Sequence, residues 1–241
     1  MSATLLIARR ELGSYLRTWT GYIILALVLL VEGLLFNAFA MGRGSKLSSE
    51  VISDFFYFSS GITLVASLFI SMRLLAEERQ SGTISLLYSS PVRDAEIVGG
   101  KFLSAFLFLA LMIALTFFMP MLVLVNGKIS LGHLGAGYLG LLLLGGAALA
   151  IGTLGSALAK NQILAVIFSG VMVVTLLLSW LLAQVTDRPF TELFTAVALH
   201  GKHFRPFQQG IVHLRDVVYY LAVIWVALFA ATRVIEARRW R

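Results

Sequence analysis

Hydrophobic residues in this chain fall into six long, nearly uninterrupted runs separated by short polar segments. The runs cover residues 20–40, 55–75, 102–125, 134–158, 163–184 and 217–235. Each is close to the ~20 residues that a helix needs to cross the hydrocarbon core of a bilayer. Neither the two-residue period of a strand nor the 3.6-residue period of an amphipathic helix marks them. The pattern predicts an all-α polytopic membrane protein with six transmembrane helices, forming one transmembrane domain over residues 1–241.

The composition agrees with this class and excludes several others. Of the 241 residues, 59% are hydrophobic and 13% charged, whereas about a quarter of the residues in soluble domains are charged. The absence of cysteine excludes disulfides, thiolate metal sites and cysteine nucleophiles. The excess of 19 Lys and Arg over 12 Asp and Glu is dispersed at span ends, without a basic stripe bearing stacking aromatics. Nucleic-acid binding is therefore not expected.

The distribution of basic residues predicts how the chain lies in the membrane. With both termini inside, the inner segments hold 12 of the 19 Lys and Arg residues and the outer segments hold 7. Because cytoplasmic segments carry an excess of Lys and Arg, we expect both termini and the loop 76–101 in the cytoplasm. The long segment 186–216 is then an outer loop, which we expect to form a re-entrant helical element before the last span.

Residues 2–19 precede the first run and have a different pattern. The spacing predicts an amphipathic helix lying in the cytoplasmic interface of the bilayer. An alternative is a helix packed on the protein's own loops. The apolar side of this helix comprises Leu5, Ala8, Leu12, Tyr15, Leu16 and Trp19.

A polar segment from Arg73 to Lys101 interrupts the apolar runs. It carries eight charges in a chain with few, namely Arg73, Glu77, Glu78, Arg79, Arg93, Asp94, Glu96 and Lys101. A short, charged, structured segment between two spans is suited to contact a partner in the aqueous phase. This segment is the strongest indication of function in the sequence.

Helix signals divide the polar segment into parts. Residues 75–80 should extend the second span beyond the membrane until Gly82 ends the helix. Thr83 is expected to cap a short helix that Pro91 stops, and Asp94 to cap the next helix. A short helix with an apolar, aromatic face is suited to dock in a groove of a soluble partner. That face comprises Ile84, Leu87 and Tyr88.

Several segments resemble the permeases of ABC-2-type transporters. The loop motif runs from Arg73 to Thr83, with Ser90-Pro91-Val92 and the segment from Glu96 to Phe102 after it. The start Ala8-Arg9-Arg10-Glu11-Leu12 is similar to the start of the same family. The end from His203 to Tyr220 resembles the subgroup of gliding-motility and copper-site-maturation permeases.

The resemblance implies a permease subunit in the bacterial cytoplasmic (inner) membrane. It would pair with a second permease copy or a paralogue and with two separate ABC ATPase subunits, and an auxiliary extracytoplasmic subunit is a further partner to consider. Residues 83–89 would be the coupling helix that docks on the ATPase, after a hinge. The ATPase-coupling residues implied are Glu77, Glu78, Arg79, Thr83, Ile84, Leu87 and Tyr88.

The chain itself is not expected to be an enzyme or to hold a cofactor. Its Gly100-Lys101 pair lacks the rest of a phosphate-binding loop, which requires Gly six residues before the Lys and Ser or Thr after it. Here those positions are Ala95 and Phe102. ATP and Mg are therefore assigned to the partner ATPase, which would power outward movement of substrate.

Glu32 lies in the middle of the first apolar run, where an unpaired charge is costly. It must be protonated, paired or facing a wet cavity. Two interpretations stay open. Glu32 is a gate or pathway residue at a dimer interface, or it makes a structural hydrogen bond, with Asn37 or with a neighbouring span.

Two other function classes and a metal site are weaker hypotheses. A standalone channel or secondary transporter would show inverted repeats and broken spans with several intramembrane charges, whereas we find one such glutamate and no evident repeat. An intramembrane enzyme would need a histidine at membrane depth, and all four lie outside the predicted spans. The His-x-x-His and His-x-x-Asp spacings of His200, His203, His213 and Asp216 arise easily by chance, so no metal is expected.

Overall fold

The structure of the protein, a computed structural model, describes residues 2–41, 46–84, 92–188 and 190–239. These residues form helices and no strand, as predicted. The helices are α1 (Ala3–Arg17), α2 (Trp19–Leu35), η1 (Phe36–Met41), α3 (Ser48–Ser71), α4 (Ala76–Gln80), α6 (Asp94–Leu115), α7 (Phe118–Asn126), α8 (Leu131–Leu158), α9 (Gln162–Val185), α10 (Phe190–Val197), α11 (Arg205–Gln208) and α12 (Leu214–Arg239).

Six helical stretches within the described residues are long and apolar enough to cross a membrane, which confirms the predicted number. They are Trp19–Met41, Ser48–Gln80, Asp94–Val125, Leu131–Leu158, Gln162–Val185 and Leu214–Arg239. The second and third begin seven to eight residues before the predicted runs because polar helical turns precede the apolar residues. Hydrophobicity marks the part of a helix inside the bilayer but not where the helix itself begins.

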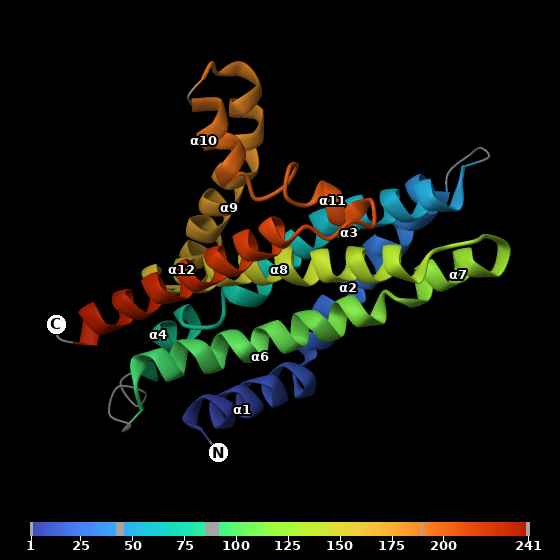
Figure 1. Ribbon diagram of the computed structural model, residues 1–241. Coiled ribbons are helices and arrows are strands. Elements are labelled where there is room, and N and C mark those ends of the chain that lie inside the picture. The colour runs from blue at the N-terminus through green and yellow to red at the C-terminus, as the bar shows by residue number, and fades with distance from the viewer. Residues whose placement is uncertain (1, 42–45, 85–91, 189, 240–241) are drawn as a thin grey trace.

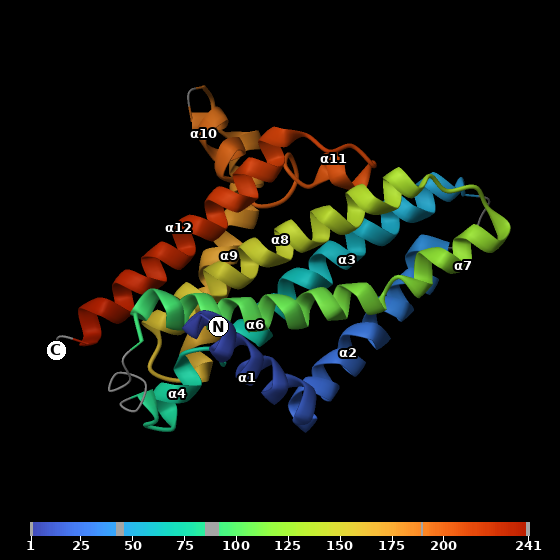
Figure 2. The ribbon, with the colours of Figure 1, turned by 60° about the horizontal axis from the view of Figure 1, so that its bottom comes forward.

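Helix α8 is the centre of the bundle. In its most apolar stretch 83% of the residues are buried, against 17% for the first span and 22% for each of the last two. Helices α3, α6, α9 and α12 all pack on α8, and Figures 1 and 2 show α8 lying among them. In Figure 1, α9 leans away from the other long helices, with α10 folded back against it. The outer helices therefore present most of their apolar surface outward.

Small residues on α8 let neighbouring helices approach closely, and Ala148, Gly152 and Ser156 recur every four residues along one of its faces. A Cβ atom added at Gly152 would lie 1.9 Å from Ser71 Oγ of α3 and 2.5 Å from its Cβ. A Cβ atom at Gly145 would lie 2.7 Å from Thr63 Cγ2, also on α3. The glycines of α8 thus set the distance between α8 and α3.

The helical extension predicted for residues 75–80 is present, but a turn separates it from the rest of the second span. Helix α3 ends at Ser71, residues 72–75 form turns, and α4 begins at Ala76. The cause is Ser156 of α8. Its Oγ accepts hydrogen bonds from the backbone N–H groups of Leu75 and Ala76, both at 3.0 Å, and donates to the carbonyl of Met72 at 3.2 Å. These bonds satisfy backbone groups that the break in the helix frees.

Pro120 interrupts the third span, as expected of a residue with no N–H. Helix α6 ends at Leu115, a turn follows at Thr116 and Phe117, and α7 carries the chain onward. Met119 N–H donates to the Thr116 carbonyl at 3.0 Å. The turn therefore bends this span while keeping that carbonyl satisfied.

The N-terminal helix α1 is separate from the first span and packs along α6 (Figure 1). Tyr15 is buried, stacks on Phe108 with ring centroids 5.0 Å apart, and donates a hydrogen bond to the Ile70 carbonyl at 3.2 Å. Burial raises the pKa of the Tyr15 hydroxyl well above its usual range, so the hydroxyl stays a donor. Leu5, Leu16 and other apolar residues of α1 remain exposed. Whether these residues lie in a bilayer interface stays a prediction.

The described residues between α9 and α12 include two short helices, α10 and α11. A buried pair joins them to α12. His203 Nδ1 lies 2.7 Å from Asp216 Oδ1, and the His203 ring stacks on Tyr219 at 3.9 Å. Of the other histidines of the weighed metal site, His200 bonds Ser60 Oγ at 2.9 Å and His213 is exposed. Among the described residues no group of three or more metal-ligating side chains occurs. The re-entrant character predicted for this segment stays a prediction.

The close approach of α3 and α8 predicts a difference between two glycines of one helix. Gly152→Ala should lower the free energy of unfolding by about 1–3 kcal/mol, because the new methyl group overlaps Ser71. Gly135→Ala is the matched control, since a Cβ there meets nothing within 4 Å and alanine is the better helix former. Thermal unfolding in mild detergent should separate the two variants. Equal stabilities would contradict the assigned packing.

Candidate functional site

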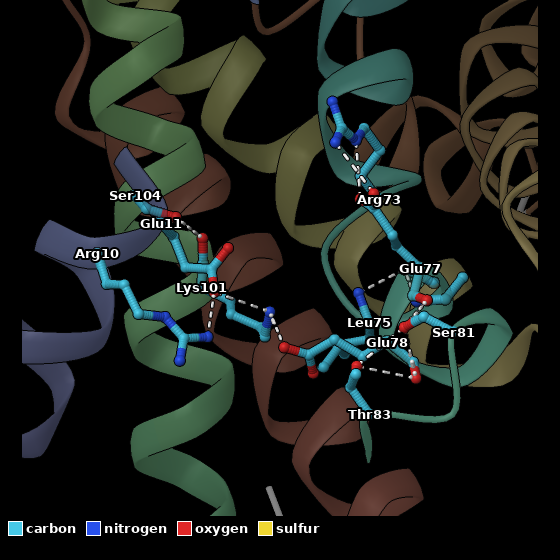
Figure 3. Close-up of polar contacts among 12 residues, drawn as sticks. Arg10, Glu11, Arg73, Leu75, Glu77, Glu78, Ser81, Thr83, Lys101 and Ser104 are labelled. Carbon is cyan, nitrogen blue, oxygen red and sulfur yellow. Dashed lines mark hydrogen bonds and ion pairs between the residues drawn. The ribbon is translucent and has the colours of Figure 1, made fainter. Parts of the chain in front are cut away.

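The predicted hinge residues Glu77, Glu78 and Arg79 all lie on α4, at one end of the bundle (Figures 1 and 3). Gly82 follows in a left-handed conformation with φ of 74°, and its N–H donates to the Arg79 carbonyl at 3.2 Å. Gly82 therefore ends this helical turn, as predicted. Thr83 Oγ1 lies 2.9 Å from Ser81 Oγ.

The predicted docking face is only partly described. Thr83 is exposed and Ile84 is half-buried. Leu87 and Tyr88, with the rest of the segment 85–91, lie outside the described residues. The coupling helix predicted over residues 83–89 therefore stays a prediction.

Two arginines fix α4 to its surroundings. Arg73, in the turn before α4, holds Glu77 in a two-pronged ion pair with distances of 2.8 Å and 3.0 Å. Arg79 Nη1 donates to the carbonyls of Ala157 and Ala159 at 2.5 Å and 2.7 Å. These carbonyls belong to the C-terminal end of α8, where cations are favoured. Helix α4 is therefore bound to α8 at its start through Ser156 and near its end through Arg79.

Lys101 of α6 makes the third attachment, and it joins two helices at once. Its Nζ lies 2.8 Å from Glu78 Oε1 on α4 and 3.4 Å from Glu11 Oε1 on α1. Figure 3 shows Lys101 between the two carboxylates. Only 2% of the lysine side chain is exposed. A buried cation requires such partners, so this ion triad holds α1, α4 and α6 together.

Glu11 is charged at neutral pH despite its partial burial. Burial raises the pKa of this carboxyl, but the cations Lys101 and Arg10 together outweigh burial and leave the pKa below its ordinary value. Arg10 Nη2 donates to Glu11 Oε1 at 2.9 Å. On the other side of the lysine, Glu78 Oε2 is buried with no hydrogen-bond partner among the described residues. Lys101 thus lies between two carboxylates, of which Glu11 shares its Oε1 with a second cation and Glu78 does not.

A second ion pair closes the same end of the bundle. Asp94 Oδ1, at the start of α6, lies 3.1 Å from Arg239 Nη1 at the end of α12. Asp94 does not cap α6, contrary to the prediction. The helix begins at Asp94 itself, and Glu96 Oε2 accepts the N–H of Arg93 at 3.1 Å. Arg238 donates to the Leu158 carbonyl at 2.8 Å, which ties α12 to the end of α8.

Glu32 lies apart from this cluster, on α2. Its carboxyl is buried and accepts a hydrogen bond from Ser59 Oγ of α3. The hydrogen-bond partner of Glu32 is therefore Ser59 on a neighbouring span, which was one of the two partners considered. Asn37, the other, does not make this bond. The hydrogen bond satisfies one oxygen and leaves the role of the residue in transport a prediction.

The residues that hold α4 in place were not assigned from the sequence. Glu11 and Lys101 appeared there only within motifs, and Ser156 only as one residue of an apolar run. One signal pointed to Lys101, because it is the single charged residue from Ile97 to Leu115. A lysine there must be buried and paired or must extend to the interface. Its partners, 90 and 23 residues earlier in the chain, could not be identified without the fold.

The triad makes a testable difference between two cations that share Glu11. Lys101→Met should cost about 3 kcal/mol of stability, because it leaves two partly buried carboxylates facing each other. Arg10→Met should cost under about 1 kcal/mol, because Arg10 is 71% exposed. Unfolding of both variants and the wild-type protein in detergent measures the two losses of stability.

The lowered pKa of Glu11 also predicts how the stability of Lys101→Met depends on pH. A carboxyl with a lowered folded pKa contributes stability above its ordinary pKa of 4.5 and loses the contribution as the pH falls through the folded value. The difference in unfolding free energy between the wild-type protein and Lys101→Met should therefore become smaller below about pH 4.5. A difference that is constant with pH would show that the lysine does not act through these carboxylates.

Comparison with known proteins identifies the family. No curated protein matches the chain. A family model described as an ABC-2 family transporter protein matches residues 45–232. This range includes the second to fifth spans, most of the sixth, α4 and both glutamates of the hinge. Proteins of this kind are non-catalytic transmembrane components that associate with ABC ATPase subunits. The chain is a multi-pass membrane protein and belongs to the ABC-2 transporter family.

Proposed function

We propose that this protein is the permease subunit of an exporter and moves its substrate outward with ATP hydrolysed by separate ATPase subunits. ATP and Mg would be bound by those subunits and not by this chain. The observation that carries the proposal is the attachment of α4. This short helix is detached from α3 by a turn, yet it is bound to α8 through Ser156 and Arg79 and to α1 and α6 through Lys101.

Such an arrangement suits a lever. Residues 83–89 follow α4 directly, so a force applied there by a docked ATPase would reach α4 first. From α4 it would pass to α8 through the arginine and serine contacts and to α6 and α1 through the lysine. Because each contact is short and buried, or charged, it transmits displacement better than an exposed loop would. The hinge residues Glu77, Glu78 and Arg79 are thus assigned to transmission, and Thr83, Ile84, Leu87 and Tyr88 to ATPase contact.

The assembly follows from the same role. Two ATPase subunits would dock on two permeases, the second being another copy of this chain or a paralogue, and an auxiliary extracytoplasmic subunit would handle the exported substrate. The excess of basic residues on the inner segments supports cytoplasmic termini in a bacterial inner membrane. The motif at the end of the chain supports a place in the gliding-motility and copper-site-maturation subgroup.

Glu32 is proposed to line the transport path or the interface between two permeases. It lies on α2, whose span is mostly unburied within one copy, although Glu32 itself is buried. The hydrogen bond from Ser59 engages one carboxyl oxygen, and the other would meet a substrate or a second copy once movement of α2 against α3 exposes it.

The docking role predicts uncoupling by charge. Leu87→Asp and Tyr88→Asp should lower substrate-stimulated ATP hydrolysis and transport in vesicles by about tenfold or more, because a buried unpaired carboxylate costs a contact several kcal/mol. The protein should stay in the membrane. Leu131→Asp, at the opposite end of the bundle and 73% exposed, is the matched control and should keep coupling. Normal coupling with ATPase retained in both aspartate variants would overturn the proposal, and purification free of any ATPase would favour a channel.

The role of Glu32 is tested by a change that keeps its shape. Glu32→Gln can still accept the hydrogen bond of Ser59 but carries no charge, so transport should fall by about tenfold, the size of one charge-assisted hydrogen bond. Ser59→Ala should alter stability more than transport. Full transport by Glu32→Gln with normal assembly would remove the residue from the mechanism and leave it a structural one.

A further inference from the structure

An apolar groove of about 700 Å³ runs along α2 and α3. Its lining extends from Thr20 to Leu35 on α2, which at 1.5 Å per residue is roughly 22 Å. This length exceeds one leaflet of the hydrocarbon core, about half of 30 Å. Leu177 of α9 and His200 close the groove at the end away from α4. The groove could therefore hold a whole hydrocarbon chain.

A second cavity of about 510 Å³ continues the groove at that end. It shares Tyr57, Leu177 and His200 with the groove, so the two spaces adjoin each other at these side chains. The chemistry of its walls is different, because they bring together aromatic, polar and cationic side chains. The remaining lining residues are Trp180, Thr195, Gly201, Lys202, Arg205 and Gln208.

The walls of the second cavity are built by backbone and ring contacts. Gly201 takes a left-handed φ of 73°, and a Cβ there would lie 3.0 Å from the Trp180 ring. Only glycine lets the turn meet the indole so closely. His200 is held by Ser60 Oγ at 2.9 Å and by the edge of the Tyr57 ring at 6.0 Å. The aromatic side of the cavity is thus fixed in place.

The two cations of the cavity have no acidic partner in the described part of the chain. Neither Lys202 nor Arg205 has a carboxylate within ion-pair distance there, whereas Lys46, Arg188 and Arg215 at the same end each have one. Burial lowers the pKa of His200, so it is neutral near pH 7. The charge in the cavity therefore comes from Lys202 and Arg205, and it is free to meet an anion.

We infer that the groove and the second cavity together bind a membrane lipid with an anionic head group. The head group lies at Lys202 and Arg205, and one acyl chain lies in the groove between α2 and α3. Tyr57 and Trp180 are residue types that favour the level of the head groups, and anionic head groups attract paired cations at a membrane surface. A neutral lipid would leave both cations unmatched, and a free anion would leave the groove unused. Binding needs no ATPase subunit, so the site is independent of the proposed transport role.

Tryptophan quenching by brominated lipids tests this site directly. A variant with Trp180 as its only tryptophan (Trp19→Phe, Trp225→Phe, Trp240→Phe) is reconstituted into phosphatidylcholine vesicles. Small fractions of phosphatidylglycerol or phosphatidylcholine brominated in the acyl chains are then added. We expect phosphatidylglycerol to bind about thirtyfold more tightly than phosphatidylcholine, so that half-maximal quenching needs an about thirtyfold lower lipid fraction. Each cation near the surface contributes about fivefold to this affinity. Lys202→Glu or Arg205→Glu changes the charge by two units, so either variant should remove nearly all of the roughly thirtyfold preference, and the double variant should invert it.

Two further variants distinguish a lipid site from a general effect of surface charge and from a contact between two copies. Lys128→Glu changes an exposed charge at the same end that lines neither cavity, so the preference should stay. Gly61→Leu should weaken phosphatidylglycerol quenching, since Gly61 lines the groove and a Cβ there meets nothing within 4 Å, so the fold is kept. Equal quenching by the two lipids, or a preference that survives the double charge reversal, overturns the site. The site is also overturned if a second copy of the chain fills the groove. In that case Gly61→Leu would lose the dimer, and neither brominated lipid would quench Trp180.

Discussion

The fold depends on how closely α8 can be approached. Inside a bilayer, helices gain little from burying apolar side chains away from lipid, and they associate through close packing and satisfied polar groups. Glycine at positions 145 and 152 removes the side chains that would keep α3 away, and serine hydroxyls then reach backbone carbonyls of the facing helix. Ser67 Oγ donates to the Gly145 carbonyl and Ser169 Oγ to the Gly152 carbonyl, both at 3.2 Å. Once these contacts place α3 and α9 on α8, the remaining spans pack around them.

The charged end of the bundle follows a different rule. There the helices leave the hydrocarbon, and ions can be retained if each one is paired. Lys101, Glu11 and Glu78 obey this rule with one cation between two anions, and Arg79 is satisfied by the free carbonyls at the end of α8. A cluster of this kind joins four elements without apolar contacts of its own. Its strength rests on the burial of Lys101, because surface ion pairs contribute little.

The membrane spans could be predicted from the sequence because hydrophobicity over ~20 residues is a local property. The break at Pro120 and the helix end at Gly82 could be predicted for the same reason, as each depends on the residue itself. The break between α3 and α4 could not, because its cause is a hydroxyl 81 residues away from Leu75. The cap at Asp94 was wrong because its carboxylate pairs with Arg239, 145 residues later in the chain. The pairing within the ion triad depends on which helices meet, which no local pattern encodes.

The hydroxyl of Ser156 has a consequence for movement. One oxygen accepts from two successive backbone amides and donates to the Met72 carbonyl, so three hydrogen bonds meet at a single atom. Two of the bonds go to Leu75 and Ala76, where α4 begins, and the third goes to Met72, where α3 ends. A single oxygen of α8 therefore holds both sides of the break between the two helices. Removing that oxygen would release both sides at once.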